Sequence, residues 1–292
     1  MTTRFFILAF ALLGFTGCDY IQSIFSPKLE IKFANYRADY QSKQDFALIE
    51  HNYPLTTVDF DKITPQYLST LDQEQIDQIY ARLTAGPIPD GAFDGDLFFP
   101  RGSSGRLRLS EIVGGLPGLI VQLKGKKLDL IGETLWKGKV FYRNERLLRN
   151  RIEDINLLRT MGLVENEPQK IDVKGKVAWL LFPAKLYCGQ SLMDSRRESI
   201  IIDYAFTDEI AGYMEKPDFL AGRRGFKVRD EIRMVRPGFY LGRAYLDRIF
   251  ILNFTLVNAE IAARDGPAFT KAGLAPEDCW AGTQPRKVVA AQ

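Results

Sequence analysis

The sequence predicts a mainly β fold of the α+β class, with an antiparallel β-barrel in the C-terminal half and N-terminal helices and loops packed outside it. Apolar residues alternate along 226–234, which is the pattern of a half-buried strand. Residues 236–239 follow with Pro at the second position and Gly at the third, as a type II turn requires. The segments 240–245 and 249–257 are rich in aromatic and β-branched residues and predict two more strands.

Helical and irregular segments precede these strands. A helix after Asp72 carries apolar residues at the spacing of one helical face, namely Ile76, Ile79, Tyr80 and Leu83. Thr64-Pro65 resembles a cap followed by the first residue of another helix. The apolar stretch 110–122 is broken by glycines and a proline, so we expect a buried irregular loop. The alternative for that stretch is an entrance flap or a loop that leans on a membrane.

Further strands are expected between these helices and residue 226, at 132–142, 177–182, 184–192 and 199–206. Strand and helix remain open for 146–155. The polar connection 208–225 has the length of a lid or binding loop. A helical turn and a tail that ends at Gln292 follow Asn258.

These patterns predict a division of the 292 residues into five parts. We expect a signal peptide at 1–17, a tether at 18–60, a helical and loop accessory region at 61–130, the barrel at 131–260 and a tail at 261–292. Hydrophobic residues make up 46% of the chain, which is enough for a substantial core and excludes disorder for most of it.

The N-terminus has the features of an export signal. Arg4 precedes an apolar run at 5–15, which is too short to span a bilayer. Thr16-Gly17-Cys18 then resembles the lipobox of bacterial lipoproteins, although Phe15 stands where that family usually has Leu. The resemblance implies acylation of Cys18, anchoring in the cell envelope and a domain that faces the periplasm. The alternative is an ordinary signal peptide.

Asp19 follows the lipidated position and resembles the inner-membrane retention signal of enterobacterial lipoproteins. It therefore favours the inner membrane. The only partners expected are the membrane, through the acyl chains, and a lipophilic small molecule.

Composition excludes several classes of function. The net charge is +3, which gives no support for nucleic-acid binding. His51 is the only histidine, and it lies in a polar stretch without a nucleophile motif. No Cys/His metal spacing and no phosphate-binding loop occurs, so we expect no metal and no cofactor. The arginine pairs 196–197 and 223–224 are expected to be solvated loop charge, the alternative being contact with anionic lipid.

The segment 89–96 is a glycine-rich stretch that carries Asp90, Asp94 and Asp96. Calcium binding is the alternative, but the regular spacing of a calcium loop is missing and turn chemistry explains the same residues. We therefore expect a turn.

Apart from Cys18, the chain contains two cysteines, Cys188 and Cys279. In an oxidising compartment they can form one disulfide that ties the tail to the middle of the sheet, and we predict this bond. Two free buried thiols are the alternative.

Two motifs stand out in the β region, Trp136-x-Gly138-Lys139 and the hairpin from Arg229-Asp230-Glu231 to Tyr240-Leu241-Gly242. They resemble calycin or lipocalin-like bacterial barrels, including GxWxG-type domains. The resemblance implies a lipocalin-like barrel that binds a ligand. The polar residues on β pattern are the candidates for the pocket: Tyr187, Asp203, Tyr204, Asp230, Arg233, Tyr240, Arg243, Asn253 and Thr255.

Three functions remain open. We expect an envelope lipoprotein that binds a lipophilic or amphiphilic molecule. The alternatives are a small isomerase or hydrolase with a buried Asp as general base, and a purely structural lipoprotein.

Asp230 shares the parity of the apolar residues around it, so it needs a buried partner. We predict Arg243, on the returning strand, as that partner.

Overall fold

The computed structural model describes residues 30–36, 44–98, 136–160 and 162–283. The chain divides into a short unit, Met1–Ile31, and a larger unit, Lys32–Gln292, which contains every described helix and strand. Cys18, Asp19 and the apolar stretch 110–122 lie outside the described residues.

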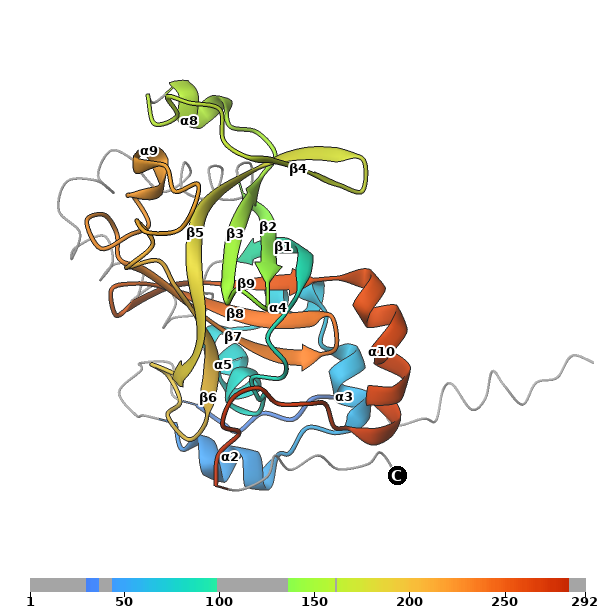
Figure 1. Cartoon of the computed structure of the whole chain (residues 1–292). Coiled ribbons are helices and arrows are strands. Elements are labelled where there is room, and N and C mark those ends of the chain that lie inside the picture. Colours follow the sequence, from blue (N-terminus) through green and yellow to red (C-terminus); the bar gives the residue numbers. More distant parts are fainter. Residues whose placement is uncertain (1–29, 37–43, 99–135, 161, 284–292) are drawn as a thin grey trace, which may run out of the picture. The chain divides into compact units, whose positions relative to one another are not determined.

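Antiparallel strands form the body of the larger unit (Figure 1). They are β1 (Gly91–Phe98), β2 (Trp136–Tyr142), β3 (Leu147–Ile152), β4 (Lys170–Val173), β5 (Lys176–Gln190), β6 (Glu198–Asp203), β7 (Val228–Arg236), β8 (Phe239–Leu246) and β9 (Ile249–Val257). The helices are α2 (Phe46–Asn52), α3 (Thr57–Lys62), α4 (Pro65–Thr70), α5 (Gln73–Ala81), α8 (Asn156–Thr160), α9 (Glu215–Asp218) and α10 (Ala259–Ala272).

The sheet closes on itself. Its strand order is β3-β2-β1-β9-β8-β7-β6-β5-β4, and β3 also pairs with β5. The second pairing joins all of these strands except β4 into an eight-stranded antiparallel barrel. The predicted fold class, a mainly β protein with an antiparallel barrel, is therefore confirmed.

The strand register decides which side chains face the barrel interior. In the β7–β8 hairpin, Asp230 pairs with Ala244, and Glu231 pairs with Arg243. Lys139 of β2 reaches Asp230 of β7, although these strands are not neighbours in the sheet, so both side chains point inward. Because successive residues of a strand face opposite sides, Glu231 and Arg243 point outward.

Aromatic rings lie close against the inner wall of the barrel. Trp136 and Phe254 meet edge to face with their centroids 5.8 Å apart. A Cβ atom at Gly95 would lie 2.3 Å from the Trp136 ring, and one at Gly242 would lie 2.2 Å from the Phe254 ring. Glycine at these two wall positions therefore makes room for the two rings.

Helix α5 covers the outer face of β6 to β9 (Figure 1). Its predicted apolar face is buried, and its polar side chains also contact the barrel. Gln73 accepts a hydrogen bond from Asn253 at 2.7 Å, and Asp77 pairs with Arg243. The helix begins where predicted, with a capping box between Asp72 and Gln75.

Helix α10 follows the barrel and packs on α3 through an edge-to-face contact of Phe269 with Phe60. The predicted turn between β7 and β8 is present, and Gly238 adopts a φ of 74° that glycine tolerates best. Among the described helices, none has both the length and the apolar character needed to cross a membrane.

Strand β1 differs from the prediction. Residues 89–96 were expected to form a turn in the accessory region, but Gly91–Phe98 pairs with β2 on one side and β9 on the other. The barrel therefore begins at Gly91 rather than after residue 130. Asp94 bonds to Arg151 and Lys174, and Asp90 accepts a bond from the Arg143 amide, so ion pairs and turn chemistry account for these carboxylates.

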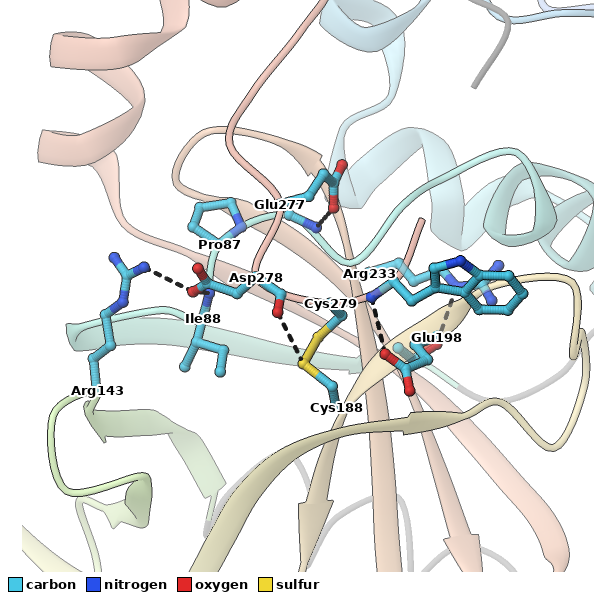
Figure 2. The surroundings of a disulfide bond; sticks show 12 residues. Pro87, Ile88, Arg143, Cys188, Glu198, Arg233, Glu277, Asp278 and Cys279 are labelled. Carbon is cyan, nitrogen blue, oxygen red and sulfur yellow. Dashed lines mark hydrogen bonds and ion pairs between the residues drawn. A yellow bond between two sulfur atoms is a disulfide. The ribbon is translucent and has the colours of Figure 1, made fainter. Parts of the chain in front are cut away.

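The C-terminal strap, residues 277–280, is held by backbone amides of the segment that precedes β1 (Figure 2). The Gly86 amide donates to Glu277 at 2.7 Å, and the Ile88 amide donates to Asp278 at 2.8 Å. The Asp278 carboxylate also pairs with Arg143 at 2.7 Å.

A disulfide fixes the same strap to β5, as predicted. Cys188 and Cys279 are joined with Cα atoms 5.3 Å apart (Figure 2). Cys188 stands opposite Ile200 of β6. Ile200 faces inward because it lies two residues before Ile202, which stands opposite the inward-facing Asp230. The strap is therefore attached at an inward-facing position near the end of β5.

Candidate functional site

A cluster of polar side chains lies inside the barrel. Lys139 comes from β2, Asn150 from β3, Tyr204 from the residue after β6 and Asp230 from β7. All four are buried, with exposed fractions of 3%, 5%, 3% and 4%. Because they come from four different segments, the closed barrel is what brings them together.

Lys139 stands at the centre of this inner cluster. Its ammonium donates to Tyr204 at 2.7 Å, to Asn150 at 2.9 Å and to Asp230 at 3.0 Å. The ammonium also lies 5.3–5.4 Å from the ring centroids of Trp136, Tyr204 and Phe254. A charge removed from water is thus balanced by one carboxylate and by the faces of three rings.

Burial controls the protonation of the cluster. It lowers the pKa of the Lys139 ammonium, and the Asp230 carboxylate opposes that change by favouring the charged form. Burial, followed by the negative charge of Asp230, raises the pKa of Tyr204 well above its usual value. Tyr204 is therefore a neutral hydroxyl group at physiological pH.

Two further groups hold the cluster in place. The Trp136 indole donates to the Asn150 carbonyl oxygen at 2.8 Å, and the Asn150 amide donates to the Phe182 carbonyl at 3.0 Å. Phe182 has a φ of 51° where β5 bends before Pro183, and its amide donates to Asp218 at 2.6 Å. The bend in β5 therefore orients Asn150, which orients Lys139.

The register separates the nine residues predicted for the pocket. The inner face carries Tyr204, Asp230 and Tyr240. Tyr240 donates to the Pro87 carbonyl at 2.6 Å and contacts Phe93, so its hydroxyl is bonded outside the Lys139 cluster. The other six face outward, and they are Tyr187, Asp203, Arg233, Arg243, Asn253 and Thr255.

The outward-facing residues belong to two different surroundings. Tyr187 is 42% exposed and donates to Asp203. Arg233 is fully buried and pairs with Asp194 at 3.0 Å. Arg243 is equally buried and pairs with Asp77 of α5. The second group is an outer polar layer between helix and barrel, separate from the inner cluster.

The predicted pairing of Asp230 with Arg243 is wrong. In the hairpin, Asp230 pairs with Ala244, whereas Arg243 stands opposite Glu231 and points to the other side of the sheet from Asp230. The expectation of a buried cation beside Asp230 is met by Lys139 instead.

One arginine pair also differs from the expectation of solvated loop charge. Arg197 is 4% exposed and pairs with Glu50 of α2, which Arg196 also contacts at 2.8 Å. Both members of the 223–224 pair form exposed ion pairs.

Sequence reasoning did not place Lys139, Asn150 or Trp136 at the site. A usable signal was present for Lys139, because it shares the parity of Phe141 within a predicted strand. A lysine on the apolar face of a strand requires a partner. Asn150 carried no such signal, since strand and helix both fitted its segment.

Comparisons with known proteins do not assign a family. No family model matches the chain, and no curated protein matches it. A structure described as the crystal structure of a protein from Thermomonospora curvata aligns with a TM-score of 0.36 and 14% identity, over 68% of this chain and 98% of that chain. The structure itself defines the class of this protein as a closed antiparallel β-barrel with a charged cluster in its interior.

Proposed function

We propose that this protein is a membrane-anchored lipoprotein of the bacterial cell envelope, facing the periplasm, that binds a lipophilic or amphiphilic small molecule inside its barrel. The observation that carries the binding proposal is the buried Lys139–Asp230 pair on an inner face made largely of aromatic and aliphatic side chains. A small-molecule site typically combines apolar walls with a few placed polar groups.

A binding function fits the inner cluster better than general-base catalysis does. A general base must be free to take up a proton from the substrate. Asp230 is instead held in an ion pair with the Lys139 ammonium at 3.0 Å, which the uptake of a proton would break. Asp203 lies on the outer face, where it accepts a hydrogen bond from Tyr187.

The location in the envelope rests on two supports. The first is the likeness of Thr16-Gly17-Cys18 to a lipobox, with Asp19 favouring the inner membrane. The second is the disulfide between Cys188 and Cys279, a bond that persists in oxidising compartments such as the periplasm.

The test compares two buried ion pairs on opposite sides of the same sheet. In the full chain, Lys139→Met with Asp230→Leu replaces the inner pair by apolar residues, and Asp77→Leu with Arg243→Met does the same to the outer pair. Such replacements preserve folding in other proteins. Binding is measured by titrating a fluorescent lipophilic probe and by identifying lipids that copurify.

We expect the inner double variant to lose affinity by about tenfold or more, since it removes the polar contacts of the site. The outer double variant should bind like the wild type. Equal binding by both variants, or no binding by the wild type, would contradict the proposal.

A further inference from the structure

The hydrogen bonds of the inner cluster can be counted atom by atom. The Lys139 ammonium has three protons and donates all three. The Asn150 carbonyl oxygen accepts from Lys139 and Trp136, and its amide nitrogen donates to the Phe182 carbonyl and, at 3.1 Å, to the Tyr204 hydroxyl. These donors and acceptors are therefore occupied within the protein.

Asp230 is the member of the cluster with capacity left. Its Oδ2 atom receives the bond from Lys139 at 3.0 Å and one from the Tyr204 hydroxyl at 3.3 Å. Both of these bonds end on Oδ2, and among the described residues none is found that donates to Oδ1. The residue is only 4% exposed and faces the barrel interior, so a donor for Oδ1 would have to lie inside the barrel.

We infer that the polar end of the ligand is a hydrogen-bond donor, an alcohol or an amine, which binds Oδ1 of Asp230. This inference rests on the proposed function and narrows its ligand class. A carboxylate or phosphate would place a second negative charge beside Asp230, and the protons of Lys139 are already taken. An amine gains in addition from the charge of the carboxylate.

The experiment uses three probes with the same tail and different heads: decanol, decylamine and decanoate. Because the tails are equal, the apolar contribution to binding cancels and differences in affinity report the head. Each probe competes with a fluorescent lipophilic reporter for the full-length wild-type protein at neutral pH, so the comparison does not depend on any variant folding.

We expect decanol and decylamine to bind at least about tenfold more tightly than decanoate, the scale of one hydrogen bond to a charged group. Asp230→Asn should reduce the affinity of decylamine relative to decanoate by about tenfold, because it removes the charge of the carboxylate. Asp203→Asn changes an outward-facing carboxylate on the neighbouring strand. It should leave the order of the affinities of the three probes unchanged.

Two results would overturn the inference. If decanoate binds as well as or better than the other two probes, the polar end of the ligand is not a hydrogen-bond donor. The proposed binding of a ligand in the barrel is then retained. If none of the three displaces the reporter, the proposed function fails and the inference fails with it.

Discussion

A single step along β7 separates a carboxylate inside the barrel from one outside it. Asp230 meets Lys139 across the interior, whereas Glu231 accepts a bond from the Leu192 amide at 2.8 Å and pairs with Arg229 on the outer side. Parity along the sequence predicted that Asp230 is buried. Its partner could not be predicted in the same way, because Lys139 is 91 positions away and reaches it only once the barrel is closed.

Removal of the Asp230 carboxylate tests that pair directly. Asp230→Ala should lower the free energy of unfolding by about 3–5 kcal/mol, because it leaves the buried Lys139 ammonium without its counter-charge. Urea denaturation followed by circular dichroism measures the change.

The matched control is Asp203→Ala, on the outer face. The lost bonds come from the Tyr187 hydroxyl, whose residue is 42% exposed, and from the Ala205 amide. Its cost should be about 1 kcal/mol. If the two alanine variants prove equally stable, the inner pair contributes little and Asp230 is retained for ligand contact alone.

Among the elements, helix α5 was predictable and strand β1 was not. The helix shows the period of an amphipathic helix and a capping box, both of which are local signals. Strand β1 has the sequence GAFDGDLF, whose glycines and aspartates predict a turn. Gly95 is needed because the Trp136 ring occupies the space of a side chain there, which is a contact between distant segments. Tertiary packing thus overrides local β propensity.

The C-terminal strap gives a test at the scale of an element. Cys279→Ser removes the disulfide to Cys188, and the free energy of unfolding should fall by about 2–4 kcal/mol, because the unfolded chain is no longer constrained by the bond. Comparison of oxidised and reduced wild-type protein in the same denaturation assay provides the control.

The hydrogen bonds that the Gly86 and Ile88 amides donate to Glu277 and Asp278 remain in that variant. The barrel should therefore stay folded at room temperature. A variant as stable as the oxidised wild-type protein would show that these hydrogen bonds alone hold the strap.

For the whole molecule, the sequence predicted a barrel but not where it starts or how it closes. The alternating and β-branched segments after residue 131 predicted strands, since each segment carries its own pattern. Closure depends on the pairing of β1 with β9 and of β3 with β5. These pairings join segments far apart in the chain, and the register that sets inner and outer faces follows from them. The predicted pocket therefore contained residues of both faces.

The proposed anchoring is also a property of the whole molecule. Cys18→Ala should abolish acylation and release the protein from the membrane fraction, because no acyl chains remain to hold it. Mass spectrometry of the mature N-terminus and cell fractionation measure both effects.

Asp19→Ser serves as the comparison. It should leave acylation intact and shift the protein from the inner to the outer membrane. An unmodified mature N-terminus at any other residue would rule out the lipoprotein assignment.

The pairing of the first barrel strand with the last one constrains the order in which the chain can fold. Asp94 of β1 pairs with Val257 of β9, so a nascent chain that has emerged only through β8 leaves β1 and β8 as two open edges. Open edges pair with other chains, and such distant pairings form slowly. A partly synthesised chain therefore needs protection from aggregation until β9 is available to complete the barrel.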